Sequence, residues 1–350
     1  MKKVLLGMSG GVDSSVAALL LKNEGYDVTG VTMHLYEGGC CNIGSTLDAK
    51  MVCKKIGIQH IILDYMTEFK DIVIKDFIEE YKNALTPNPC IICNRYFKFG
   101  YMYKKAKDMG FDYVATGHYA KSEYSEKYNR YVIKKSKNIK KDQSYFLYDI
   151  DKNIVKDLLF PLGDFEDKEE IRKIAKDNGL TRVSSKPDSE DICFITDGNY
   201  KSFLEKNSDI TKKEGNIVFK DGKILGKHNG LYNYTIGQRK GLKIAYKEPL
   251  FVIGFNKEKN EVIVGTKEDT LRKEMIVRNL NLLAIDEIKE NMHVSVKTRY
   301  STNEAKATIN KIENEDAIKV IFDEKTANIT SGQSAVFYDG DIVIGGGIIA

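Results

Sequence analysis

The sequence has few cysteines, little arginine and no long apolar run. Six cysteines in 350 residues are too sparse for a disulfide scaffold. No segment approaches the roughly 18 apolar residues that a membrane-spanning helix needs, which excludes a membrane span. Neither an internal repeat nor a low-complexity linker is present. Only eight of the 54 basic residues are Arg and the net charge is +4, so charge alone is weak evidence for a nucleic-acid partner.

The composition that remains is that of a folded protein with two or three domains. Hydrophobic residues make up 42% and charged residues 30%, which excludes intrinsic disorder. Val4-Leu5-Leu6 superficially resembles the start of a secretory signal, but Gly10, Gly11 and Asp13 interrupt it. We therefore expect a cytoplasmic protein with reduced thiols. In that compartment cysteine pairs indicate chemistry or metal binding more often than crosslinks.

The first 115 residues alternate between strand and helix patterns, which predicts a doubly wound parallel sheet with helices on both faces. The expected strands are Lys2–Met8, Asp27–His34, Gln59–Asp64 and Phe111–Ala115. The expected helices are Asp13–Asn23, Thr46–Ile56 with Ser45 as its N-cap, Thr67–Asn83 and Asn94–Met109. After about residue 205 the pattern changes to short alternating runs separated by Gly, Asn and Asp, which predicts antiparallel β structure.

The strongest motif is Ser9-Gly-Gly-Val-Asp-Ser-Ser15, between the first strand and the first helix. Its glycines let the backbone approach an anion, and the helix N-terminus adds unpaired N–H groups. Asp13 is suited to Mg²⁺ beside phosphates. A Walker P-loop would carry Lys here, and its lack disfavours cleavage of the γ-phosphate. The loop closely resembles that of the ATP pyrophosphatases, which implies cleavage of ATP between its α and β phosphates.

Two cysteines are candidates for sulfur chemistry. The two prolines in Thr86-Pro-Asn-Pro89 predict an extended segment, which places Cys93 at the start of the helix expected from Asn94. A thiol at a helix N-terminus has a lowered pKa, as a nucleophile requires. Cys193 lies in Ser189-Glu-Asp-Ile-Cys-Phe194. The alternative, a buried structural thiol, is less consistent with these loop contexts.

The segment Lys127–Lys141 holds seven basic residues and no acidic one. On charge alone, a solvated hairpin rim and a contact to nucleic-acid phosphates are about equally well supported.

Six motifs together resemble the family of bacterial tRNA-specific 2-thiouridylases. They are Ser9–Ser15, Thr86-Pro-Asn-Pro-x-x-x-Cys-Asn94, Thr116-Gly-His-Tyr119, Lys141-Asp-Gln-Ser-Tyr-Phe-Leu147, Asp191-Ile-Cys-Phe194 and Tyr234-Thr-Ile-Gly-Gln-Arg-Lys-Gly241. The resemblance runs in order from residue 4 to the C-terminus. It implies an α/β catalytic domain of the adenine nucleotide α-hydrolase type over residues 1–205. A central β-rich domain over 206–272 and a C-terminal β-barrel over 273–350, contacting tRNA, would follow.

The resemblance also implies a reaction. The enzyme would adenylate the C2 oxygen of the wobble uridine of Lys, Glu and Gln tRNAs, using ATP and Mg²⁺. Sulfur from a persulfide on Cys193 would then replace AMP, and Cys93 would be the nucleophile that can pair with Cys193. AMP and pyrophosphate would be released. The implied partners are tRNA and a persulfide-donating sulfur-relay protein, and we expect a monomer that does not contact membranes.

The family's binding residues carry over onto matching positions. ATP would contact Gly7, Met8, Ser9, Gly10, Gly11, Val12, Asp13, Ser14, Met33 and Gly117. The tRNA would contact Asn88, Pro89, Cys90, His118, Lys141, Asp142, Gln143, Arg299, Tyr300 and Gln333. Because Lys141 falls in the family's tRNA-contacting stretch, the resemblance favours a phosphate contact for the basic segment. His118 and Tyr300 have structural alternatives, as a hydrogen-bonding His and a core aromatic.

Cys90 departs from the family pattern, because many members carry Asp at this position. Cys90, Cys93 and Cys193 could together hold an iron–sulfur cluster or zinc, but a site without resident metal is preferred, since one Cys-x-x-Cys is a weak signal. Two different functions also stay open: an ATP pyrophosphatase with a different substrate, and a redox-sensing RNA-binding protein. Cys40 and Cys41 have no assigned role.

Overall fold

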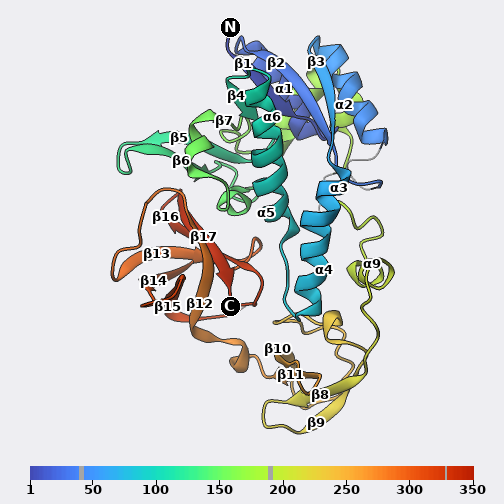
Figure 1. Cartoon of the computed structure of the whole chain (residues 1–350), viewed down its shortest axis with the longest axis vertical. Coiled ribbons are helices and arrows are strands. Elements are labelled where there is room, and N and C mark those ends of the chain that lie inside the picture. Colours follow the sequence, from blue (N-terminus) through green and yellow to red (C-terminus); the bar gives the residue numbers. More distant parts are fainter. Residues whose placement is uncertain (39–42, 188–191, 328) are drawn as a thin grey trace.

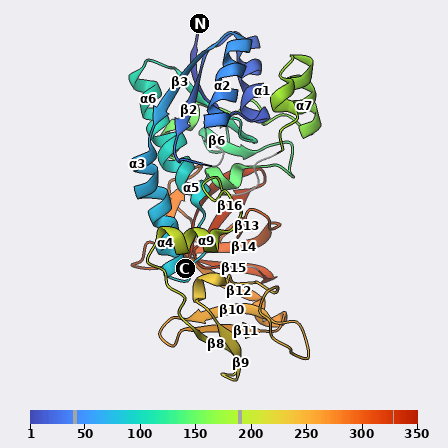
Figure 2. The same ribbon diagram turned by 90° about the vertical axis from the view of Figure 1, so that its right-hand side faces the viewer.

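Three sheets organise the chain, and they follow one another along the long axis of the molecule (Figures 1 and 2). The computed structural model describes residues 1–38, 43–187, 192–327 and 329–350. Cys40 and Cys41, and the Ser189–Asp191 part of the Cys193 motif, lie outside these residues. Within the described ranges, no helix is both long enough and apolar enough to cross a membrane. The boundaries near residues 205 and 272 stay a prediction.

The first sheet is parallel and has the strand order β3-β2-β1-β4-β7. Its strands are β1 (Lys3–Gly7), β2 (Asp27–His34), β3 (Gln59–Asp64), β4 (Tyr113–Ala115) and β7 (Leu158–Leu159). Alternate residues of β1 enter different cores: Val4 and Leu6 pack on one face and Leu5 on the other. The sequence prediction of a doubly wound sheet is therefore confirmed.

Helices cover both faces of this sheet (Figure 1). One face packs against α1 (Val12–Asn23), α2 (Ile43–Ile56), α7 (Lys168–Asp177) and α8 (Thr181–Ser184). The other face packs against α6 (Met102–Asp108). The expected N-cap at Ser45 is wrong, because α2 already begins at Ile43.

Two long helical stretches lead away from the sheet. The first comprises α3 (Met66–Phe69), the π-helical segment Lys70–Ile74 and α4 (Lys75–Lys82). The second comprises α5 (Pro89–Cys93), the π-helical segment Asn94–Tyr101 and then α6. The second begins five residues before the predicted start at Asn94, because Pro89 occupies the first helical turn, where the missing N–H of proline costs no hydrogen bond.

After α9 (Tyr200–Asn207) the chain forms a small four-stranded sheet with the order β10-β11-β8-β9. Its strands are β8 (Gly215–Phe219), β9 (Ile224–His228), β10 (Phe251–Asn256) and β11 (Glu261–Gly265). Ile217, Val252, Val262 and Val264 form its core. This sheet lies at the opposite end of the molecule from β1 (Figure 1).

The last strands close a barrel. They are β12 (Arg272–Leu282), β13 (Met292–Lys297), β14 (Ala305–Lys311), β15 (Ala317–Thr326), β16 (Ser334–Asp339) and β17 (Ile342–Ile349). Pairing of β12 with β17 joins the two ends. A Cβ at Gly345 would sit 2.3 Å from the Asn281 oxygen, and one at Gly347 would sit 2.6 Å from the Arg278 oxygen. Glycine in β17 therefore permits the close approach that closes the barrel.

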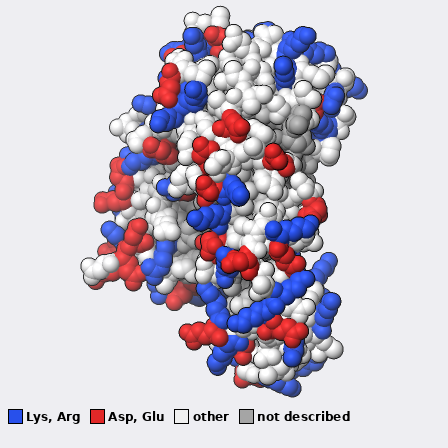
Figure 3. Space-filling view, turned by 45° about the vertical axis from the view of Figure 1, so that its right-hand side comes forward, with Lys and Arg blue, Asp and Glu red and all other residues white. Residues whose placement is uncertain are grey.

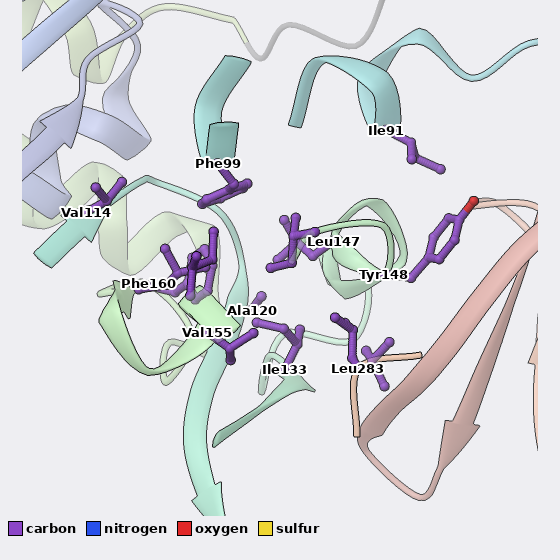
Figure 4. Packing of buried hydrophobic residues seen from close by; sticks show 14 of the residues in the cluster. Ile91, Phe99, Val114, Ala120, Ile133, Leu147, Tyr148, Val155, Phe160 and Leu283 are labelled. Atoms are coloured by element: carbon purple, nitrogen blue, oxygen red, sulfur yellow. The ribbon is translucent and has the colours of Figure 1, made fainter. Parts of the chain in front are cut away.

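A hairpin that follows β4 docks on this barrel. Its strands are β5 (Ala120–Ser125) and β6 (Arg130–Lys135), and β6 pairs with β17 through Lys134 and Ile342. The hydrophobic core continues across the same junction: in Figure 4 Leu283 lies beside Ile133 and Tyr148. The parallel-sheet region and the barrel thus share one core.

This docking gives most of the basic segment 127–141 partners within the protein, and its contact to tRNA phosphates stays a prediction. Five of its seven basic residues form ion pairs with carboxylates, several of them on the barrel: Lys127–Asp339, Arg130–Asp286, Lys134–Asp341, Lys135–Glu304 and Lys137–Asp164. Local sequence could not reveal these partners, because four of the five lie more than 140 residues away. The segment is mainly an ion-paired interface between domains. Figure 3 shows acidic and basic side chains side by side across the middle of the molecule.

Candidate active site

A cavity of about 320 Å³ lies at the carboxyl ends of β1 and β2, where open α/β sheets bind their ligands. Its walls come from several parts of the chain: the loop after β1, the end of β2, α5, the loop after β4 and the segment Ile192–Phe194, together with Phe69, Val73, Lys98 and Gln143. A larger hollow of about 750 Å³ lies against α4 and the segment 206–209. The smaller cavity is the candidate site, because all three predicted cysteines and most of the predicted nucleotide residues line it; Gly10, Gly11 and Val12 are not among its lining residues.

The loop after β1 can take its shape only with glycine. Gly10 has a φ of +72°, and a Cβ there would sit 2.2 Å from the carbonyl oxygen of Ser45. The loop after β4 approaches as closely, since a Cβ on Gly117 would lie 2.8 Å from the backbone nitrogen of Ser14. These two glycines leave the backbone at the start of α1 facing the cavity, where N–H groups can meet an anion.

Asp13, in the first turn of α1, is held by two groups from distant parts of the chain. The hydroxyl of Tyr119 donates to its Oδ1 at 2.8 Å, and Nζ of Lys168 lies 3.0 Å from its Oδ2. Lys168 begins α7, which packs beside α1. Lys168 was not predicted as a site residue, because nothing local links it to a loop 155 residues earlier.

A second lysine reaches the same loop. Nζ of Lys186 donates to the Gly10 oxygen at 3.1 Å and pairs with the buried Asp48 of α2. Arg182 also pairs with Asp48, at 2.7 Å. The loop contains no lysine of its own, so its cations come from the segment between residues 168 and 186.

The donor set near the loop fits a magnesium–nucleotide complex. Asp13 and Ser14 present carboxylate and hydroxyl oxygens at the cavity, and Mg²⁺ is usually held by one or two carboxylates together with phosphates and water. No group of three or more His, Cys, Asp or Glu side chains that could hold a metal occurs among the described residues. Cys90, Cys93 and Cys193 are all described, and the preference for a site without resident metal stays a prediction.

The three cysteines nevertheless line the same cavity as the nucleotide loop. The predicted position of Cys93 is wrong: α5 begins at Pro89, so Cys93 lies in its second turn and is 9% exposed. The exposed Cys90 occupies the first turn instead. Any effect of the helix N-terminus on a thiol therefore acts on Cys90 more than on Cys93. Cys193 approaches the cavity from another segment and is partly buried.

His118 and Lys98 form part of the wall between the cysteines and the nucleotide loop. His118 shares a hydrogen bond of 2.7 Å with the hydroxyl of Thr116, and its Nε2 lies 3.3 Å from Nζ of Lys98. Burial, and secondarily the Lys98 ammonium, hold the pKa of His118 well below its usual value of 6.5. His118 is therefore neutral at physiological pH, and its Nε2 is suited to accept a hydrogen bond from the Lys98 ammonium rather than a proton. Lys98 is a site residue that the sequence alone did not indicate.

This pKa shift predicts a pH dependence of stability. Below about pH 6.5 the unfolded chain protonates His118 and the folded chain does not, so the free energy of unfolding falls as the pH falls. Replacing His118 by Gln should remove a slope of up to about 1.4 kcal/mol per pH unit. Urea unfolding of both proteins between pH 5 and 8 measures the difference. Equal slopes would contradict the burial of a neutral His118.

The predicted tRNA-binding residues form two groups, one at or near the cavity and one on the barrel. Asp142 is buried and accepts hydrogen bonds from the backbone and hydroxyl of Ser144, so its carboxylate shapes the loop. Gln143 lines the cavity and accepts a bond from the Tyr119 nitrogen. Asn88, Pro89 and Cys90 belong to the α5 end of the site. Their contacts to tRNA stay a prediction.

Three further predicted residues lie on the barrel. Tyr300 packs on Phe146 with ring centroids 4.6 Å apart. Arg299 and Gln333 each hydrogen-bond to backbone carbonyls of other parts of the chain. Gln333 thereby connects the barrel with the segment before α5, although the two are more than 200 residues apart.

Three domain families match consecutive parts of the chain and together cover almost all of it. The tRNA methyl transferase HUP domain matches residues 2–197. The tRNA methyl transferase PRC-barrel domain matches 201–266, and the aminomethyltransferase beta-barrel domain matches 272–349. A parallel sheet with a nucleotide loop, joined to these two β domains, defines a class of tRNA-modifying enzymes.

Full-length relatives narrow this class. The tRNA-specific 2-thiouridylase MnmA of Clostridioides difficile is 50% identical over 356 residues, which cover 99% of this chain and 98% of that protein. The MnmA of Acetivibrio thermocellus is 47% identical over 358 residues, covering 99% of both. The chain belongs to the tRNA-specific 2-thiouridylase family.

Proposed function

We propose that this enzyme converts the wobble uridine of Lys, Glu and Gln tRNAs to 2-thiouridine. The observation that carries the proposal is one cavity lined both by the nucleotide loop and by Cys93 and Cys193. An enzyme that only joined an amine to an adenylated group would not need thiols beside the nucleotide. A redox-sensing RNA-binding protein would not need the loop.

The first step makes the C2 oxygen of uracil a leaving group. This oxygen attacks the α-phosphorus of ATP, a new O–P bond forms, and the bond to the β-phosphate breaks to release pyrophosphate. The loop amides would stabilise the charge on the departing phosphates, and Lys168 and Lys186, which contact the loop at Asp13 and Gly10, would add positive charge nearby. Mg²⁺, when bound at Asp13, would neutralise part of the same charge. The base must leave the anticodon stack to reach the cavity.

The second step transfers sulfur. The outer sulfur of a Cys193 persulfide attacks C2, and AMP departs with the original oxygen. The Cys93 thiolate then attacks the inner sulfur of Cys193, so the S–S bond breaks, 2-thiouridine is released and a Cys93–Cys193 disulfide forms. An external thiol reductant regenerates the two thiols. Alternatively, Cys93 attacks the persulfide first, and the released sulfide attacks C2.

This chemistry requires a protein partner that loads Cys193 with sulfane sulfur, and the partial exposure of Cys193 supports access. Action on tRNA fits the expected cytoplasmic location. A monomeric state stays a prediction.

The proposal is tested by incubating the purified protein with unmodified tRNA, ATP, Mg²⁺ and sulfide. Nucleoside mass analysis should find 2-thiouridine at the wobble position, with one AMP and one pyrophosphate for each thiolated base. Thiolation without AMP would refute adenylation, and an AMP-dependent product containing nitrogen instead of sulfur would indicate a different substrate.

Ion pairing changes what we expect of the basic segment in tRNA binding. Lys134 and Lys135 are compensated by carboxylates, whereas Lys140 is exposed at the turn that leads to Lys141. Replacing Lys140 by Ala should lower the slope of log affinity against log salt by roughly one for the phosphate that the variant no longer binds. Replacing Lys134 or Lys135, one at a time, should change this slope much less. Equal effects of the three single variants in filter-binding titrations would contradict this difference.

A further inference from the structure

A turn of the barrel, residues 330–333 between β15 and β16, lies against the segment 85–88 that leads into α5. The two stretches are about 245 residues apart in sequence. In Figure 1 the chain between α4 and α5 runs beside the barrel. This contact joins the barrel, which is expected to bind tRNA, to the segment that leads into α5, and α5 carries Cys90 and Cys93.

The contact consists of backbone groups and one side chain. The Thr86 nitrogen donates to the Ser331 oxygen at 3.0 Å. Nε2 of Gln333 donates to the carbonyls of Thr86 and Pro87, at 2.9 and 3.2 Å. Gly332 has a φ of +88°, and a Cβ there would lie 2.7 Å from the Thr86 nitrogen. Only glycine allows the turn to approach this closely.

The end of the segment nearest α5 lies close to β16. Asn88, which directly precedes the first residue of α5, lines the same hollow as Ser334, the first residue of β16. The buried phenol of Tyr145 donates to the Ser334 oxygen at 2.9 Å. The start of this helix thus lies beside β16.

The same turn is attached to the central β domain. Nη2 of Arg299 donates to the Ile236 oxygen at 2.8 Å and hydrogen-bonds to the Thr330 hydroxyl. Ile236 belongs to the Tyr234–Gly241 motif, to which the proposed chemistry assigns no role. A continuous path of hydrogen bonds therefore joins the central domain, the barrel and the start of α5.

We infer that Gln333 is a positioning residue, which fixes the 85–88 segment and thereby sets the position of the Cys93 thiol at the cavity. The segment contains Pro87 and Pro89 follows it, so it has fewer backbone donors and depends on bonds from outside. The Gln333 Nε2 donors are already bonded to two protein carbonyls, so a contact to tRNA would use its Oε1. The importance of Cys93 for catalysis rests on the proposed function.

The test compares Gln333→Met and Gln333→Glu with the wild type, using the full chain in its reduced form. Met keeps the side-chain length without the two donors, and Glu places a carboxylate against two carbonyls. Peptide mass spectrometry measures the alkylation rate of Cys93, with the fully buried Cys53 as internal reference. Loss of two ordinary hydrogen bonds should raise the Cys93 rate roughly tenfold. The Cys53 rate should not change.

The accompanying kinetics separate positioning from RNA contact. For both variants we expect kcat for thiolation to fall roughly tenfold and the Kd for tRNA to change by less than about twofold. The matched control is Gln59→Met, at the exposed start of β3, which should change neither quantity. An unchanged alkylation rate of Cys93 would overturn the inference. If the alkylation rate is unchanged and the Kd for tRNA increases, Gln333 is an RNA contact instead.

A parallel rise at Cys53 would indicate general loosening and would also overturn the inference. The alkylation rates require neither ATP nor tRNA nor sulfur. A wild-type protein without thiolation activity would therefore refute the proposed function, and the comparison of Cys93 between variants would still decide the role of Gln333.

Discussion

Cys193→Ser is expected to abolish thiolation when sulfur comes from a protein persulfide donor. Oxygen cannot accept and pass on sulfane sulfur, whereas serine is close to cysteine in size. The variant should bind ATP and tRNA within about twofold of the wild type, because the nucleotide loop and the barrel lie on other segments. Nucleoside mass analysis gives the product, and equilibrium titrations give the two affinities.

The control for this variant is Cys53→Ala. Cys53 is fully buried against α1 and β2, and burial raises the pKa of its thiol to about 11. This variant should lose some stability but retain thiolation. Addition of free sulfide to Cys193→Ser distinguishes two roles: rescue means that the thiol only relays sulfur, and failure of rescue means that it also takes part in the attack on C2. Full thiolation activity of Cys193→Ser with the protein persulfide donor would contradict both roles of the Cys193 thiol.

Asp13→Asn is expected to lower pyrophosphate release by roughly a hundredfold or more. The substitution keeps the size of the side chain and an oxygen that can accept from Tyr119. It removes the charge that pairs with Lys168 and that would hold Mg²⁺. A coupled pyrophosphate assay with saturating tRNA measures the effect.

Asp27→Asn is the matched control, because Asp27 is exposed and lies at the amino end of β2, whereas the nucleotide loop lies at the carboxyl ends of the strands. Its pyrophosphate release should equal that of the wild type. Normal pyrophosphate release by Asp13→Asn would show that Asp13 is not needed for ATP cleavage and would contradict the proposed role of the loop.

Local sequence patterns predicted the N-terminal sheet well because its determinants are local. The bounds of β2 and β3 agree with the expected Asp27–His34 and Gln59–Asp64. Each strand is a short β-rich run that ends near a glycine or a helix signal, so neighbouring residues suffice. The loop after β1 was recognisable for the same reason, since its glycines and serines are contiguous.

Features that depend on distant partners were not predictable in this way. Lys168 lies at the nucleotide loop because α7 packs beside α1. The charges of Lys127 and Lys135 in the basic segment are compensated by Asp339 and Glu304 of the barrel. Strand β17 has only a weak local strand signal because of Gly345–Gly347, although barrel closure requires small residues there. The start of α5 was misplaced because Pro89 was read as a helix breaker when it occupies the first turn.

The central claim is that sulfur carried by Cys193 enters a uridine that ATP has activated in the same cavity. Its most direct test loads the protein with ³⁴S persulfide, removes the donor, and adds tRNA and ATP for a single turnover. We expect ³⁴S-labelled 2-thiouridine, formed only with ATP and matched by an equal amount of AMP, and a Cys93–Cys193 disulfide in the protein. Unlabelled product, or label transfer without ATP, would contradict the claim.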